Sequence, residues 1–137
     1  DVSHQVPCVL EYIPYGCGAF TVKRDEQRLA YFASQGIACC RVDMRGSGDS
    51  TGLYYDEYLP QEQQDAIRII EFLSKLDWCT GSIAMYGKSW AGFNGLQVAA
   101  LQPKGLDCVV SLYSTVDRYE DDIHFFGGLF NASGHVP

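Results

Sequence analysis

Residues 82–92 read Ser-Ile-Ala-Met-Tyr-Gly-Lys-Ser-Trp-Ala-Gly, and the architecture of the chain can be predicted from this stretch. Residues 82–86 form an apolar run typical of a strand, and residues 90–102 have the length and composition of a helix. Ser89 therefore falls on a tight turn between a strand and a helix. On such a turn the serine hydroxyl is exposed at the carboxyl end of the sheet, and the amide of the next residue faces the oxygen of an attacked carbonyl. We interpret Ser89 as a candidate nucleophile.

Small residues surround Ser89, as this kind of turn requires, because larger side chains would collide with the neighbouring strand or helix. Gly87 lies two residues before it, and Gly92 and Gly95 follow at helical spacing. Ala91 stands where a second glycine is expected. The alternative interpretation is a serine that only caps the following helix, since serine is a favoured N-cap residue. The strand before Ser89 and the small-faced helix after it favour the nucleophile.

Two glycine-rich stretches resemble nucleotide-binding loops but lack the parts that those loops need. Residues 87–89 read Gly-Lys-Ser, yet a phosphate-binding loop would place a glycine at position 82, which is Ser82, and the residues between form a strand. Gly46 and Gly48 follow a strand, but the next residues are aromatic and irregular, so that no helix N-terminus is available for a pyrophosphate. The sequence therefore predicts no nucleotide site, and we expect no cofactor.

Apolar runs and helical patterns alternate on both sides of this stretch. Further strands are predicted at residues 6–13, 37–42 and 106–113, and further helices at residues 25–35 and 60–76. Strands separated by helices of ten or more residues imply right-handed crossovers and a parallel sheet. The sequence thus predicts an α/β fold with a mostly parallel sheet and helices on both faces.

The composition of the chain argues against several classes of function. The 137 residues include 10 basic and 17 acidic side chains, a net charge of −7, and no basic run, which argues against binding nucleic acid or anionic membranes. No apolar run approaches the roughly 20 residues that cross a bilayer, so we expect a soluble protein. The six cysteines lack the paired spacing of metal sites, and we expect no metal. No targeting signal can be read at Asp1, so the compartment stays open, with the cytoplasm slightly favoured.

Several short segments carry a further signal through their order and spacing. They are Ile13-Pro14-Tyr15, Arg24-Asp25-Glu26, residues 41–52 (Arg-Val-Asp-Met-Arg-Gly-Ser-Gly-Asp-Ser-Thr-Gly), Asp56-Glu57-Tyr58, Trp78-Cys79-Thr80-Gly81, Gly87-Lys88-Ser89-Trp90 and Asp121-Asp122-Ile123-His124. Over nearly the whole chain they resemble the X-Pro dipeptidyl-peptidase and cocaine-esterase-like family of α/β-hydrolases. The resemblance implies a partial α/β-hydrolase fold, truncated before the cap and the last strands. Residues 1–113 would be the N-terminal portion of the catalytic domain, and residues 114–137 the start of an inserted cap.

The resemblance also implies roles for individual residues. Ser89 would be the nucleophile of a serine hydrolase that cleaves ester or amide bonds, those of X-Pro peptides included, through an acyl-enzyme. The main-chain N–H of Trp90 and the phenol of Tyr15 would form the oxyanion hole. Tyr15 follows the end of the first strand, where an α/β-hydrolase supplies its second donor. The partner would be a small-molecule ester or a short peptide. Asp43, Arg45 and Ser50 are expected to brace the loop after the second strand.

The general base is the least determined part of the site. Serine attack needs a histidine that takes the proton and a carboxylate that orients it. Asp117 and His124 follow Ser89 in the required order, but only seven positions separate them, too few for the usual strand and helix between. We therefore expect them to be cap or hinge residues, with the acid and histidine outside this chain, which would then be a weakly active or inactive fragment. The alternative is a non-catalytic α/β binding domain in which Ser89 is a helix cap.

Overall fold

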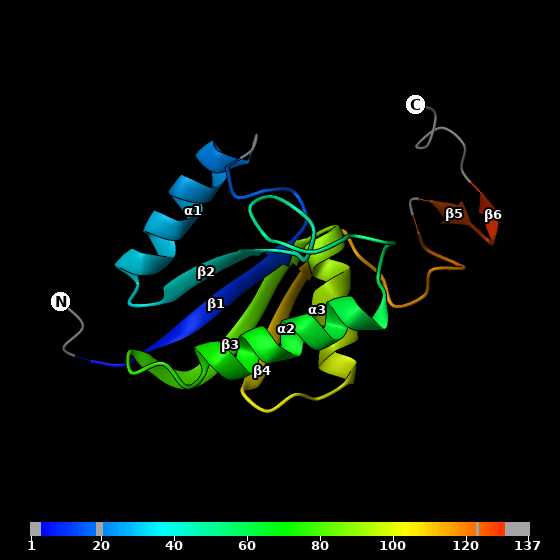
Figure 1. Cartoon of the computed structure of the whole chain (residues 1–137). Helices are drawn as coiled ribbons and strands as arrows, with labels where there is room; N and C mark the ends of the chain where they lie inside the picture. The colour runs from blue at the N-terminus through cyan, green and yellow to red at the C-terminus, as the bar shows by residue number, and fades with distance from the viewer. Residues whose placement is uncertain (1–3, 19–20, 123, 131–137) are drawn as a thin grey trace.

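The centre of the computed structural model, which describes residues 4–18, 21–122 and 124–130, is a four-stranded sheet (Figure 1). The strands lie in the order β2-β1-β3-β4, and all three pairs are parallel. They are β1 (Val6–Ile13), β2 (Ala38–Asp43), β3 (Cys79–Lys88) and β4 (Leu106–Leu112). The predicted parallel sheet is confirmed, and the carboxyl ends of all four strands meet at one edge.

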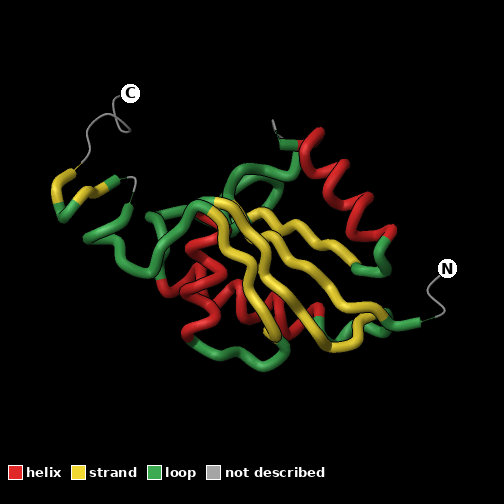
Figure 2. The backbone as a smooth tube through the Cα atoms, turned by 180° about the vertical axis from the view of Figure 1, so that it is seen from behind, coloured by secondary structure: helices red, strands yellow, loops and turns green. Residues whose placement is uncertain are grey.

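Three helices connect the strands and lie on both faces of the sheet. They are α1 (Val22–Ser34), α2 (Pro60–Leu73) and α3 (Trp90–Ala100). The helices α2 and α3 contact each other and β3 on one face, whereas α1 packs on the other face beside β2 (Figures 1 and 2). The prediction of helices on both faces is confirmed.

Most elements differ in extent from the prediction by one to three residues, and two differences matter for the packing. The strand β3 begins at Cys79 rather than at residue 82, because Cys79 pairs with Val6 of β1. Gly81 hid this extension, since glycine is depleted in strands. The helix α2 ends at Leu73, so that Leu76, inside the predicted range 60–76, lies beyond its last turn. The pairing of β3 with β1 and the end of α2 depend on contacts that the local sequence pattern does not show.

The main core lies between the sheet and the pair α2 and α3. Leu10 and Met85 come from the central strands, and Ile70 and Val98 come from the two helices that cover them. All four side chains are nearly or fully inaccessible to solvent. Burying such a side chain contributes about 1.5–3 kcal/mol, so this layer supplies much of the free energy that holds β3 and α3 in place.

The helix α1 packs on the sheet through half-buried Leu29 and Phe32, with the Phe32 ring 6.2 Å from that of Tyr86, and through a group of charges. Its buried residue is Asp25, and the facing carboxylate is Glu11 of β1. Arg28 bridges both, with its Nη2 2.5 Å from Glu11 Oε2 and 3.0 Å from Asp25 Oδ1. Arg41 of β2 pairs with the same two carboxylates. We name Glu11, Asp25, Arg28 and Arg41 the α1 charge cluster.

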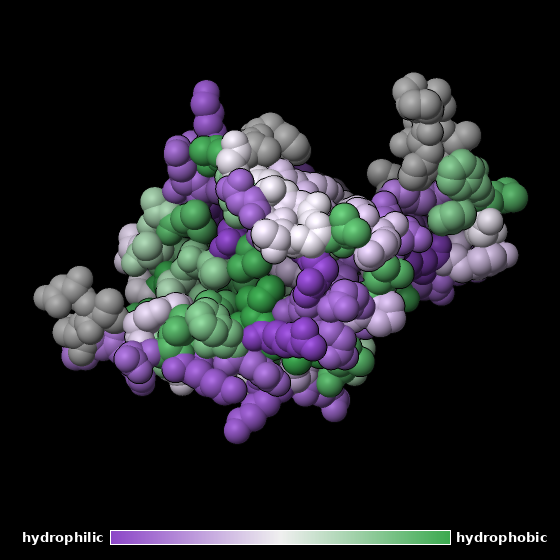
Figure 3. Space-filling view, viewed as in Figure 1, coloured by the Kyte–Doolittle hydropathy of each residue, from purple (hydrophilic) through white to green (hydrophobic). Residues whose placement is uncertain are grey.

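The edge strand β4 leaves part of the sheet without a helix. Val109 and Ser111 face α3, and the Ser111 hydroxyl donates to the Gly92 carbonyl at 3.2 Å. The alternate residues Cys108, Val110 and Leu112 are exposed on the other face of the sheet, where α1 lies beside β2 and no described helix lies over β4 (Figure 2). On the opposite side of the molecule, apolar surface also gathers between α1 and α2, beside the other edge strand β2 (Figure 3).

The segment after β4 leaves the sheet and ends in a short antiparallel pair, β5 (Phe125–Phe126) and β6 (Leu129–Phe130) (Figure 1). No helix in the described part of the chain has the length and apolar character that a bilayer span needs. Among the same residues, no group of three or more His, Cys, Asp or Glu side chains is arranged to hold a metal ion.

Candidate active site

Ser89 stands between the last residue of β3 and the first residue of α3, in a backbone conformation that side chains rarely adopt. Its φ is +59° and its ψ is −122°. Its N–H donates to the Leu112 carbonyl of β4 at 2.8 Å, and its carbonyl accepts from the amides of Gly92 and Phe93 at 2.8 and 3.0 Å. The backbone of the turn is thereby fixed from both sides. The Ser89 side chain makes no capping hydrogen bond to α3, so the helix-cap interpretation has no support in the geometry.

The small residues around the turn are required by close packing. A Cβ at Gly87 would overlap the backbone of Ala91. A Cβ at Gly92 would lie 2.6 Å from the Ser114 hydroxyl and 3.0 Å from the Leu112 carbonyl oxygen. Ala91 is tolerated in place of a second glycine because its methyl group uses the space that Gly87 leaves. The predicted reason for the small residues is confirmed.

A cavity of about 320 Å³ opens beside Ser89 at the carboxyl edge of the sheet. Ser89 and Phe93 form one side, and the segment after β4 forms the other, through residues 113–115 and through Asp121 and Asp122. The serine therefore faces a space large enough for a small substrate group. The opposite wall belongs to the segment that we expected to begin a cap.

Trp90, the first residue of α3, is held through its side chain. Its amide has no acceptor within the helix, because the first N–H groups of a helix never do. Its indole Nε1–H donates to Glu62 Oε1 at 2.8 Å, and its ring lies on Tyr58, with 4.9 Å between the ring centroids. Tyr54 flanks the same ring at 5.9 Å. The residue that would supply an oxyanion donor is thus clamped from α2 and from the loop before it.

The sequence did not point to Glu62. It lies in the first turn of α2, where an acidic residue is explained by the helix dipole alone, and its partner Trp90 is 28 positions away. Its side chain is buried and also accepts the Tyr58 amide at 2.9 Å. Burial raises the pKa of Glu62, although the hydrogen bonds from Trp90, Tyr58 and Asn94 oppose the rise.

Tyr15 lies two residues beyond the end of β1, which pairs in parallel with β3. It is therefore at the same edge of the sheet as Ser89. Burial raises the pKa of Tyr58, and the Tyr15 phenol is among the neighbouring groups that add to the rise.

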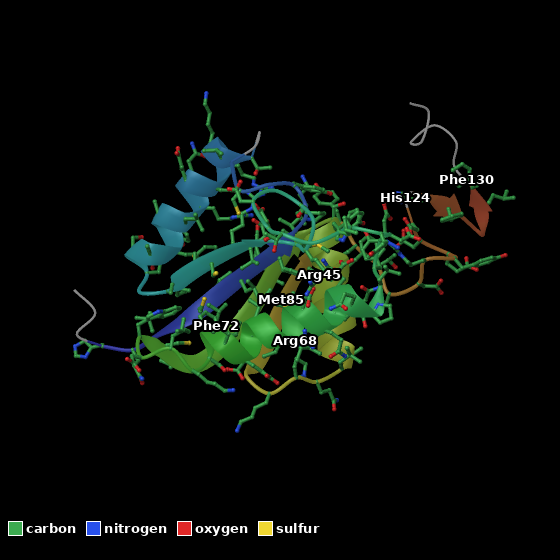
Figure 4. The ribbon with its side chains drawn as sticks, in the orientation of Figure 1. Arg45, Arg68, Phe72, Met85, His124 and Phe130 are labelled. Carbon is green, nitrogen blue, oxygen red and sulfur yellow. The ribbon has the colours of Figure 1, made fainter. Side chains whose placement is uncertain are left out.

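The loop after β2 is braced as expected. The Ser50 hydroxyl donates to the Asp43 carbonyl at 2.7 Å, and the Asp49 amide donates to the Asp43 carboxylate at 3.2 Å. Arg45 reaches from the loop to α2 and binds both oxygens of Asp65, at 2.7 and 2.8 Å (Figure 4). The pKa of Asp65 is lowered, chiefly by this guanidinium. Asp43, Arg45 and Ser50 therefore hold loop structure, as predicted.

The structure does not bring Asp117 and His124 together. Asp117 is exposed, and its Oδ1 accepts the amides of Tyr119 and Glu120 at 3.0 and 3.1 Å, which closes its own turn. The carboxylate that meets His124 is Asp122, whose Oδ1 lies 3.2 Å from Nδ1 of the ring. We therefore correct the candidate pair: the acid beside His124 is Asp122. His124 lies with β5 and β6, to the side of the sheet (Figure 4).

Asp122 is buried at the wall of the cavity and ties the segment after β4 to the turn. Its Oδ2 lies 3.0 Å from Nε of Arg118. The Arg118 guanidinium lies over the rings of Tyr58 and Phe93, 4.2 and 4.0 Å from their centroids. This places the segment against α3 and the aromatic loop. Of the other histidines, His4 precedes β1 at the far edge of the sheet, and His135 is outside the described residues.

Comparison with known proteins gives the same fold and a family. The chain resembles an aminopeptidase from a marine sediment archaeon of the Thaumarchaeota (TM-score 0.78, 23% identity, 98% of this chain and 25% of that one). It also resembles a CocE/NonD family hydrolase from Staphylococcus aureus (TM-score 0.76, 21% identity, 93% of this chain and 26% of that one). These α/β-hydrolase structures establish the fold of the chain.

Curated relatives are similar in sequence. A Mycobacterium bovis protein named as a serine esterase is 31% identical over 111 residues, 81% of this chain and 18% of the relative. The cocaine esterase of a Rhodococcus species is 26% identical over 135 residues, 96% of this chain and 23% of the relative. The chain thus spans about a fifth of the length of the curated relatives that it matches. The sequence profile of the X-Pro dipeptidyl-peptidase (S15) family matches residues 1–137, and this chain, an α/β-hydrolase in fold, belongs to that family of hydrolases.

Proposed function

We propose that the protein is a serine hydrolase that cleaves ester or amide bonds through an acyl-enzyme on Ser89. The observation that carries the proposal is the positive φ of Ser89 on the turn from β3 to α3, beside the cavity. A serine held in this strained conformation presents its hydroxyl away from both neighbouring elements. Membership of a hydrolase family supports the reaction class.

The mechanism follows from the placement of the groups. The Ser89 oxygen attacks the carbonyl carbon while its proton passes to a general base. The Trp90 amide and the Tyr15 phenol donate to the oxyanion of the tetrahedral intermediate, where preorganised donors act most strongly. Collapse of the intermediate expels an alcohol or an amine, which takes up that proton. Water then gives a proton to the base and attacks the acyl carbonyl carbon; the ester bond to Ser89 breaks, its oxygen takes up that proton, and the carboxylic acid is released.

The histidine and its acid are proposed to come from parts of the protein beyond these 137 residues. The much greater length of the relatives leaves ample chain for them. Asp117 is engaged in its own turn, and His124 and Asp122 lie in the segment that we propose begins the cap, residues 114–137. Residues 1–113 would then supply the nucleophile and the oxyanion hole. The substrate would be a small ester or a short peptide, with X-Pro peptides included on the strength of the family.

A fluorophosphonate probe tests the proposal on the protein expressed from its complete coding sequence. We expect one covalent adduct, detected by intact mass, that is lost in Ser89→Ala and retained in Ser82→Ala, a matched serine on β3. Hydrolysis of p-nitrophenyl acetate should fall by at least ~10⁴-fold in Ser89→Ala. An adduct that persists in Ser89→Ala, or a wild-type protein that forms none, would contradict the proposal.

A further inference from the structure

Glu62 is the buried carboxylate that connects α2 to the start of α3. It is 6% exposed, and its two oxygens take different donors. Oε1 accepts the indole N–H of Trp90 at 2.8 Å, and Oε2 accepts the backbone N–H of Tyr58 at 2.9 Å. A carboxylate whose two oxygens each accept a hydrogen bond from the protein is fixed in orientation.

These contacts restrain both the edge and the face of the Trp90 indole ring. The edge is bound by Glu62, and the face is covered by Tyr58, whose ring is tilted by 31° from the indole plane. The N-terminus of α3 has no side-chain cap, since Ser89 makes no capping hydrogen bond. Helix ends fray unless something holds them. The clamp on the Trp90 side chain supplies the restraint that a cap would otherwise give.

Tyr58, whose amide donates to the other oxygen of Glu62, is itself held in an uncommon backbone conformation. Tyr58 has a φ of +56°, which costs free energy in a non-glycine residue. Such a conformation persists only when its surroundings over-determine it. The bond from the Tyr58 amide to Glu62, together with Arg118 on the Tyr58 ring, provides those restraints. Glu62 therefore binds the indole N–H of Trp90 directly and, through the Tyr58 amide, holds the ring that covers the face of the indole.

We infer that Glu62 is a positioning residue for the reaction at Ser89: it holds Trp90 so that the Trp90 backbone N–H points at the oxyanion. This inference rests on the proposed function. Glu62 is not among the residues that line the Ser89 cavity, so it acts through Trp90 and does not touch the substrate. Misplacement of a catalytic group by about 1 Å can lower a rate by as much as ~10²-fold.

The test compares variants of the complete protein by the second-order rate of fluorophosphonate labelling and by kcat and KM for p-nitrophenyl acetate. We expect Glu62→Ala to lower the labelling rate and kcat by about 10- to 100-fold, with KM within about twofold. Trp90→Phe keeps the backbone N–H and removes only the indole donor, and we expect a similar loss. Glu62→Gln keeps an oxygen for the indole N–H and should restore most of the rate.

The double variant Glu62→Ala/Trp90→Phe should be no slower than the slower single variant, because both changes break the same contact. Asp65→Ala is the matched control: it removes a carboxylate from the same helix whose partner is Arg45, and its labelling rate should equal that of the wild type. Thermal unfolding checks that each variant is folded.

The possible results distinguish the inference about Glu62 from the proposed function at Ser89. If the wild type labels at Ser89 and Trp90→Phe or folded Glu62→Ala labels at the wild-type rate, the inference about Glu62 is overturned and the proposed function stands. Additive losses in the double variant, or an equal loss in Asp65→Ala, also overturn it. If the wild type does not label at Ser89, the proposed function fails and this inference fails with it.

Discussion

At the scale of single residues, the site depends on backbone strain at Ser89. A φ of +59° is unfavourable for any residue with a Cβ, yet the turn is held by backbone hydrogen bonds to Leu112, Gly92 and Phe93. The free energy stored in this conformation comes from the folding of the whole sheet. Under the proposed function this strain serves catalysis, since the turn places Ser89 beside the cavity.

Replacement of Ser89 by glycine should relieve this strain. We expect Ser89→Gly to be more stable than Ser89→Ala by about 1 kcal/mol, because glycine adopts positive φ without steric cost. Urea unfolding of the two variants, which both lack the hydroxyl, measures the difference. The control pair is Ser82→Gly and Ser82→Ala within β3, where glycine should be the less stable. Equal stability of the two Ser89 variants would show that the turn is unstrained.

Residues near in sequence were predictable, and residues joined across the fold were not. The strand, the turn at Ser89 and the small residues after it form one local pattern, so their arrangement could be read directly. The contact between Glu62 and Trp90 joins two elements, and no local pattern encodes it. The same limit applies to Asp122, which replaced Asp117 as the partner of His124 only once the turn at residues 117–120 was seen.

At the scale of elements, α1 differs from the other helices in how it is attached. Its Leu29 and Phe32 are half-buried, Ala33 is exposed, and the fully buried residue is Asp25. The α1 charge cluster adds to the apolar contact between Phe32 and Tyr86. Glu11 lies in the predicted strand 6–13, and its burial is explained by three arginines beside it, Arg24, Arg28 and Arg41.

Removal of one charge from this cluster should be costly. We expect Glu11→Ala to lower the free energy of unfolding by about 3–5 kcal/mol, because it leaves half-buried Arg28 and Arg41 with one carboxylate between them. Urea unfolding at neutral pH measures the loss. Glu26→Ala, which removes an exposed carboxylate from α1, is the control and should change stability by less than about 0.5 kcal/mol. A loss for Glu11→Ala as small as the control's would mean that the cluster does not anchor α1.

At the scale of the whole molecule, β4 leaves apolar surface exposed. Val110 is 45% exposed and Leu112 is 40% exposed, on the face where α1 lies over β2 and no described helix lies over β4. Exposed edge strands with apolar faces promote association. The chain spans about a fifth of the length of its curated relatives, and under the proposal that further chain completes the protein we expect those parts to cover this face.

The isolated segment of residues 1–137 should therefore self-associate. We expect Val110→Lys to shift it towards the monomer in size-exclusion chromatography with light scattering, because a charge on the edge strand opposes pairing. Tyr31→Lys, which replaces an exposed aromatic residue on α1, should leave the association unchanged. In the complete protein, Val110→Lys should instead lower stability, since the side chain would be covered there. A monomeric wild-type segment would argue against an uncovered interface.

The guanidinium of Arg118, which lies over the rings of Tyr58 and Phe93 and pairs with Asp122, would affect substrate entry under the proposed function. One wall of the cavity beside Ser89 is fastened by the same aromatic rings that steady Trp90. A bulky acyl group that pushes this wall outward must also disturb those rings. Larger acyl groups would then be accepted only with slower acylation. Substitution of Arg118 would change the balance between these two properties.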